Sequence, residues 1–195
     1  MDGVTPELHA TQNRGLRELY ATTRQLVNHW STLSSRLPAG AAVDALDDGV
    51  ERGRALLDEL RPLTESFGLY GFPAAQGVGV TLAGARSTVG DRFLERNQAL
   101  RIAVLDVQHV VTLLGYLAQV ARTLGQQELL DFCTRWEREL LAVERAARRA
   151  AVKGGADPDD AVERADESAA GKAAHGASYA IGSVGEWLDR ARRGR

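Results

Sequence analysis

The sequence predicts an all-α fold, a bundle of long helices with one long crossover, and three observations lead to this prediction. Apolar residues recur at three- and four-residue steps through most of the 195 residues. Of the five prolines, only Pro62 falls inside a helical pattern, so long helices are permitted elsewhere. Glycines concentrate in residues 66–91, between the second and third helical patterns.

The first two helices are predicted over residues 5–37 and 43–67. Thr5 suits an N-cap position, and Pro38-Ala39-Gly40 ends the first pattern. Pro62 is predicted to kink or loosen the last turns of the second helix. Because the connection is short, we expect these helices to be antiparallel neighbours.

The glycine-rich segment, residues 66–91, is too long for an ordinary loop inside a compact domain. Extended at about 3.3 Å per residue, it is long enough to run the length of a helical bundle. We therefore predict that it is a crossover between the second and third helices.

The third helix, predicted over residues 91–124, carries two apolar stripes. The first consists of Phe93, Leu100, Val104, Val107, Val111, Leu114, Ala118 and Ala121. The second consists of Ile102, Leu105, His109, Leu113, Tyr116 and Val120. A helix that is apolar on most of its circumference is buried on more than one side. This helix is therefore predicted to be either the central helix or part of a subunit interface.

Two further helices are predicted, over residues 126–153 and 157–193. Gly154-Gly155 ends the fourth helix, and Asp157-Pro158 opens the fifth. The fifth helix would bury a stripe of mainly small residues, namely Val162, Ala169, Ala173, Ala177, Ala180, Val184 and Trp187. The domain prediction is a four-helix bundle over residues 1–154 and an additional C-terminal helix over residues 155–195, packed on the bundle or on a partner.

Composition and charge narrow the class of protein. A formal net charge of −2 provides no basic footprint, so no nucleic-acid partner is expected. No stretch reaches the roughly 18 apolar residues that span a bilayer, so no membrane span is predicted. The first 15 residues lack the basic and apolar regions of a secretory signal. With Cys133 as the single cysteine, a disulfide within the chain is excluded, and we expect a cytoplasmic protein.

One group of residues suggests metal chemistry. Asp106 and His109 lie three residues apart on one helical face, the spacing by which helix bundles present ligands to paired iron or manganese ions. Glu51 on the second helix and Glu137 and Glu144 on the fourth complete the candidate ligand set. The favoured interpretation is structural, a hydrogen-bonded Asp–His pair or an interface histidine, with the glutamates on a solvated face.

A resemblance to a known family is carried by six segments in order: Leu16-Arg17-Glu18-Leu19-Tyr20-Ala21-Thr22-Thr23-Arg24-Gln25-Leu26, Leu57-Asp58-Glu59-Leu60, Gly68-x-x-x-x-Pro73, Val107-Gln108-His109, Leu113-Leu114-Gly115-Tyr116 and Ala121-x-x-Leu124-Gly125-x-x-Glu128-Leu129-Leu130. Over about residues 14–150 the chain resembles a bacterial, stress-associated branch of the ferritin-like superfamily. The resemblance implies an antiparallel four-helix bundle with a long crossover. The predicted fifth helix lies outside the family pattern.

The chain departs from that family at its metal ligands. The resemblance implies glutamates at the positions of Thr23 and Gln108, and a histidine or another ligand near Arg54. The resemblance thus leaves only Glu51, His109 and one of Glu137 or Glu139 as direct ligands. So few anionic oxygens would hold a dinuclear centre weakly. The resemblance therefore implies a ferritin-like scaffold with a degenerate metal site.

Three functions are compatible with these observations. The favoured one is a non-catalytic ferritin-like bundle that needs no cofactor and acts as an interaction or structural protein in stress response. It would form a homodimer, or bind a protein partner, through the third or fifth helix. The alternative is an oxidase or iron-handling protein that binds iron or manganese through the five candidate ligands. A third is a carrier of small apolar ligands lined by Trp30, Tyr116 and Trp136.

Overall fold

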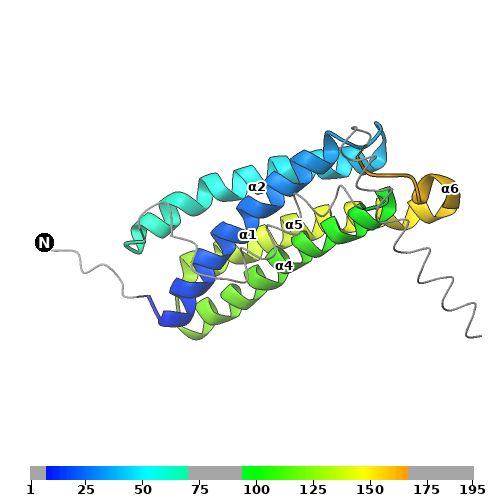
Figure 1. The fold of residues 1–195 in the computed structure, drawn as a ribbon. Helices are drawn as coiled ribbons and strands as arrows, with labels where there is room; N and C mark the ends of the chain where they lie inside the picture. The colour runs from blue at the N-terminus through cyan, green and yellow to red at the C-terminus, as the bar shows by residue number, and fades with distance from the viewer. Residues whose placement is uncertain (1–7, 70–93, 167–195) are drawn as a thin grey trace, which may run out of the picture.

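A computed structural model describes residues 8–69 and 94–166 of the chain (Figure 1). In this part 84% of the residues are helical and no strand is present. The elements are α1 (Ala10–Ser34), α2 (Ala41–Ser66), α4 (Arg96–Thr123), α5 (Gln127–Lys153), the 3₁₀ turn η2 (Gly154–Ala156) and α6 (Pro158–Ala161). The four long helices pack against one another, which confirms the predicted all-α bundle.

Each long helix packs mainly against two others, since α1 and α5 both contact α2 and α4. Figure 1 shows that α2 ends at one end of the bundle and that α4 begins at the opposite end. The second and third helices are therefore not hairpin neighbours. Most of the predicted crossover, residues 66–91, falls within residues 70–93, which lie outside the described residues.

The first helix begins later than predicted. Its N-cap is His9, whose Nδ1 accepts a hydrogen bond from the backbone N–H of Thr11 at 3.3 Å. Gln12 returns the contact, because its Oε1 accepts from the backbone N–H of His9 at 3.2 Å. The expected N-cap, Thr5, lies outside the described residues.

Glycine ends two of the four long helices. Gly68 follows α2 with φ 72°, and Gly125 follows α4 with φ 68°. In each case the next residue donates its N–H to a carbonyl five residues back, from Leu69 to Thr64 and from Gln126 to Ala121, both at 2.9 Å. This is the Schellman motif, which satisfies the last carbonyls of a helix. The predicted end of the third helix at Gly125 is confirmed.

Close approach between α1 and α2 also depends on glycine. A Cβ atom added at Gly49 would lie 2.2 Å from Cζ3 of Trp30, and one added at Gly53 would lie 2.7 Å from Cγ2 of Val27. The Trp30 ring is fully buried and donates its Nε1–H to the carbonyl of Ala103 at 3.1 Å. Gly49 thus makes room for Trp30, the largest fully buried side chain, and Gly53 makes room for Val27.

The two apolar stripes of α4 have opposite environments. The described residues of the first stripe are all buried, and Val107 and Leu114 are fully so. In the second stripe only Leu113 is buried, while Leu105 is 61% exposed and Tyr116 is 50% exposed. Within the described part of the chain, α4 is thus not a central helix enclosed on all sides.

The composition of α4 is as apolar as that of a membrane-spanning helix. Its 28 residues include an 18-residue window with a mean hydropathy of 1.4, which by length and composition alone is sufficient to cross a membrane. In the folded bundle 44% of that window is buried. A core helix of a water-soluble bundle passes the same test, so burial of the first stripe accounts for much of this composition.

The predicted fifth helix is wrong at its start. Asp157 caps α6 by accepting from the N–H of Asp160 at 3.1 Å, but α6 has only four residues. Arg164 then pairs with Glu95 in an isolated antiparallel bridge, because the backbone groups after α6 bond to residues 94–96 rather than to the next helical turn. Val162, predicted to lie on the buried stripe, is 54% exposed. The remainder, residues 167–195, lies outside the described residues.

Candidate functional site

The five predicted metal ligands lie on different surfaces of the bundle. Glu51 is exposed on α2, and it forms no hydrogen bond or ion pair among the described residues. Asp106 and His109 face α1, but at different depths. Glu137 and Glu144 lie on the side of α5 that faces α4. Three of the five, Asp106, His109 and Glu144, each pair with a different side chain of another helix, and none of the five pairs with another member of the set among the described residues.

Asp106 contacts a histidine that the sequence analysis did not select. Its Oδ2 is hydrogen-bonded to Nδ1 of His29, which α1 contributes from 77 positions earlier in the chain. The His29 side chain is fully buried, whereas 18% of the Asp106 side chain is exposed. The contact joins α1 to α4. It also gives the buried His29 imidazole a hydrogen-bond partner in place of the water that it has lost. The predicted Asp106–His109 pair is therefore wrong.

His109 has a separate partner. Its Nε2 lies 3.0 Å from Oε1 of Glu18 on α1, and both side chains are about half exposed, at 53% and 45%. Pairs of this kind contribute only about 0–1 kcal/mol, because solvent screens the charges. His109 thus lies on the outside of the seam where His29 is buried.

The seam between α4 and α5 contains a second buried polar contact. Gln108 donates from Nε2 to Oε1 of Glu144 at 3.0 Å, and Glu144 is only 8% exposed. Glu137 and Glu144 were both expected on a solvated face, and for Glu144 this expectation is wrong. Two helical turns further along α4, a Cβ atom added at Gly115 would lie 2.9 Å from Oε1 of the half-buried Glu137. Gln108, where the resemblance implies a metal-binding glutamate, is here a hydrogen-bond donor to a carboxylate.

Two other positions that the resemblance assigns to ligands are also occupied by groups unsuited to that role. Thr23 is fully buried, and its Oγ1 has no hydrogen-bond partner in the described part of the chain. Its methyl carbon would lie 3.9 Å from a Cβ atom added at Gly53, so the side chain fills the seam between α1 and α2. Arg54 is exposed on α2.

The arrangement as a whole does not fit a dinuclear centre. Over residues 8–69 and 94–166, no three side chains among His, Cys, Asp and Glu form a group able to hold a metal ion. The fully buried side chains at the centre are apolar, among them Leu26, Leu56, Leu114 and Leu140. Carboxylate ligands of such a centre project inward from facing helices, and here the inward positions are taken by leucine.

Cys133 is a core residue. It is fully buried on α5, and burial raises the pKa of its thiol to about 12, with a smaller contribution from the charge of Glu137. The thiolate is the reactive form of cysteine, and at neutral pH almost none is present at such a pKa. Cys133 therefore does not supply a nucleophile.

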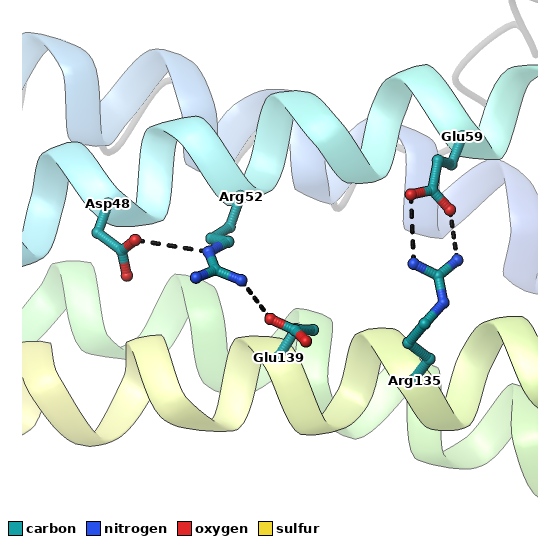
Figure 2. Close-up of polar contacts among 5 residues, drawn as sticks. All are labelled: Asp48, Arg52, Glu59, Arg135 and Glu139. Carbon is teal, nitrogen blue, oxygen red and sulfur yellow. Dashed lines mark hydrogen bonds and ion pairs between the residues drawn. The ribbon is translucent and has the colours of Figure 1, made fainter.

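Exposed ion pairs connect α2 to α5 (Figure 2). Arg135 contacts both carboxylate oxygens of Glu59, and Arg52 contacts Glu139 and, at 3.5 Å, Asp48. The hydrogen bond from Arg135 lowers the pKa of Glu59. Glu139, a possible ligand by the resemblance, is thereby engaged with an arginine.

The three aromatic residues of the carrier hypothesis differ in their exposure within the described part of the chain. Trp30 and Trp136 are buried, whereas Tyr116 is half exposed on the other side of α4. A cavity of about 820 Å³ lies instead beside α5, lined by Glu59, Pro62, Leu63, Arg122, Glu128, Leu130, Asp131, Phe132, Thr134, Arg135 and Arg138. Its charged side chains have mixed sign, which specifies no ligand class.

Comparison of the chain with family models, with curated proteins and with solved structures finds no match.

Proposed function

We propose that this chain is a non-catalytic ferritin-like bundle that acts through protein contacts, as an interaction or structural protein in stress response. One observation carries the proposal. The second apolar stripe of α4 is left largely uncovered. Its surface, here called the α4 outer face, has Ile102 and Leu105 towards one end and Tyr116 and Val120 towards the other. Exposed apolar surface of this kind is typical of protein–protein contact sites.

The contacts made by the acidic residues support the non-catalytic part of the proposal. Catalysis needs titratable groups that converge on a cleft open to substrate. In the described part of the chain, the partly buried Asp106 and the buried Glu144 are each used in one contact between neighbouring helices. These contacts hold the helices together, and neither residue lines the cavity beside α5.

Elemental analysis tests the absence of a metal-dependent function. The full chain, purified from cells supplied with iron and manganese, is expected to hold no more than about one metal ion per two chains, because the anionic ligands are too few. A full dinuclear complement that is lost in His109→Ala would overturn the proposal and establish the metal-binding alternative.

Photo-crosslinking tests the interaction surface directly. A photoreactive amino acid at position 105 is expected to form protein adducts in cells, because this side chain is 61% exposed on the α4 outer face. The matched control is position 54, which is also exposed but lies on α2. Equal labelling at both positions would show that the α4 outer face is not a contact site.

A further inference from the structure

The α4 outer face has a spacing that a copy of itself would match. Leu105 and Tyr116 are its two large exposed apolar side chains. They are separated by three helical turns, about 16.5 Å, and the exposed residues between them are polar, His109 and Thr112. Two such faces laid antiparallel would place Leu105 of each chain on Tyr116 of the other.

The neighbouring helix carries a charged pair with the same spacing. Glu137 is half-buried beside Gly115 of α4. Arg148 is exposed three helical turns later, and this spacing puts it on the same face of α5. They too are eleven positions apart in the sequence. Neither has an ion-pair partner within residues 8–69 and 94–166, in contrast to Arg52 and Arg135 on the other side of the α5 seam.

The two spacings share a midpoint. Gln108 lies beside Glu144, and Gly115 lies beside Glu137, so these contacts fix which residues of α4 and α5 are level. The midpoint between Leu105 and Tyr116 is therefore level with residues 141–142 of α5. The midpoint between Glu137 and Arg148 is residues 142–143, only about 1.5 Å further along the helix.

From this coincidence we propose that the partner on the α4 outer face is a second copy of this chain, related by a twofold axis perpendicular to α4. The proposal rests on the proposed function and names its partner. One axis places Leu105 on the partner's Tyr116 and Glu137 beside the partner's Arg148, each twice, as an isologous interface requires. The half-buried Leu141 lies at the axis, where it meets the partner's Leu141.

The alternative symmetric arrangement does not use these charges. A twofold axis parallel to α4 and running along its outer face would place α5 of each chain opposite α1 of the partner, because α1 and α5 flank α4 on different sides. Glu137 and Arg148 would then not face their counterparts, whereas the perpendicular axis places opposite charges beside each other.

The available surface is sufficient for a stable dimer. α4 has 28 residues and is about 42 Å long. Together with the adjoining edges of α1 and α5, it presents a strip about 20 Å wide, given a helix diameter of about 10–12 Å. Its area is therefore close to the ~800 Å² per partner of a standard interface.

Sedimentation equilibrium of the full chain tests the proposal. The protein is expected to be a dimer at tens of micromolar, and Leu105→Ser/Tyr116→Ser is expected to be a monomer with unchanged helical circular dichroism. Val162→Ser removes an apolar side chain that is 54% exposed outside this face, and it should leave the dimer intact. A monomeric wild-type chain would overturn the second-copy proposal, whether or not it binds lipid vesicles. A monomer that crosslinks to a different protein through position 105 would overturn the second-copy proposal but would leave the proposed function standing.

A charge exchange tests the arrangement of the two copies. Glu137→Arg and Arg148→Glu should each weaken the dimer about tenfold or more at low salt, because each opposes like charges. The double variant Glu137→Arg/Arg148→Glu should restore the association of the wild type. Double-variant association as weak as that of the single variants would overturn the proposed pairing.

Engineered disulfides provide an independent readout of the same geometry. Under oxidation Leu105→Cys/Tyr116→Cys should crosslink into dimers, whereas either single variant should not, since equivalent positions lie about 16 Å apart across the axis. Efficient crosslinking by Leu105→Cys alone would show a different axis and overturn the proposal.

Discussion

The inner and outer faces of α4 are both apolar, but the bundle treats them differently. On the inner face Val107, Leu114 and Leu117 are fully buried, while on the outer face Leu105 and Tyr116 are half or more exposed. A helix at a corner of a four-helix bundle has two main neighbours, and these cover only part of its circumference. The comparison teaches that apolar periodicity locates the apolar positions of a helix but does not say how many neighbours will cover them.

The polar residues of α4 show the same division. Asp106 and His109 come from one short sequence motif, and both contact α1. Asp106 meets the buried His29, whereas His109 meets Glu18 in solvent. The Asp106–His29 contact replaces hydrogen bonds to water that the buried groups have lost. The His109–Glu18 contact is in solvent, so hydrogen bonds to water compete with it.

The largest effect is expected on the inner face. Leu114→Ala should lower the free energy of unfolding by about 2–5 kcal/mol, because it leaves a cavity in a fully packed core. Leu105→Ala, the matched change on the outer face, should change it by no more than about 0.5 kcal/mol. Urea unfolding at a concentration low enough for monomers measures both. Equal losses would erase the distinction between the faces.

A glycine pair sharpens the contrast at the level of backbone packing. Gly49→Ala should cost about 1–3 kcal/mol, because its Cβ would lie 2.2 Å from the rigid Trp30 ring. Gly115→Ala should be neutral or stabilising, since the Cβ there meets only the flexible carboxylate of Glu137 and alanine favours the helix. The same unfolding measurement applies. A tolerated Gly49→Ala would mean that the α1–α2 seam has room to move apart.

The two histidine–carboxylate pairs differ by a smaller amount. Asp106→Ala should cost about 1–3 kcal/mol, because it removes the carboxylate that the buried His29 contacts. His109→Ala removes an exposed pair and should cost no more than about 1 kcal/mol. Thermal unfolding at neutral pH compares them. The reverse order would indicate that His109 has a role beyond its contact with Glu18.

The smallest effect is expected at the surface ion pair of Glu59 and Arg135. The hydrogen bond from Arg135 lowers the pKa of Glu59 in the folded state below its ordinary value of 4.5. The contribution to stability is therefore present above that ordinary value and is lost as pH falls through the lower folded-state pKa. Glu59→Gln should cost about 0.5 kcal/mol or less at neutral pH, given the exposure of the pair, and nothing in acid. Unfolding curves at both pH values, with and without 1 M salt, check this order of magnitude.

Local features of the sequence were sufficient to predict the helices. The apolar stripes predicted all four long helices, and the glycine at position 125 and Gly154-Gly155 predicted the ends of two of them, because helix geometry and glycine conformation act over a few residues. The prediction failed for the segment after Asp157. There, backbone hydrogen bonds to residues 94–96 form in place of further helical turns. The local sequence pattern cannot predict a partner so distant in the sequence.

The candidate site was predictable only in part. The second stripe of α4 was visible as periodicity, and the departure of Thr23, Arg54 and Gln108 from ligand residue types was visible in the sequence. The partners of the polar residues were not. His29 lies 77 positions from Asp106, and Glu18 lies 91 positions from His109.

The sequence by itself determined that this protein forms long amphipathic helices, where most of them end and which helix carries apolar residues on two sides. Only the tertiary structure decided which of those two sides is covered, that Asp106 turns to His29 while His109 stays in solvent, and that Gly49 admits Trp30. The reason is the range of the interactions. Helix periodicity and capping depend on neighbours within about five residues, whereas burial and hydrogen-bond partners depend on which helices pack side by side.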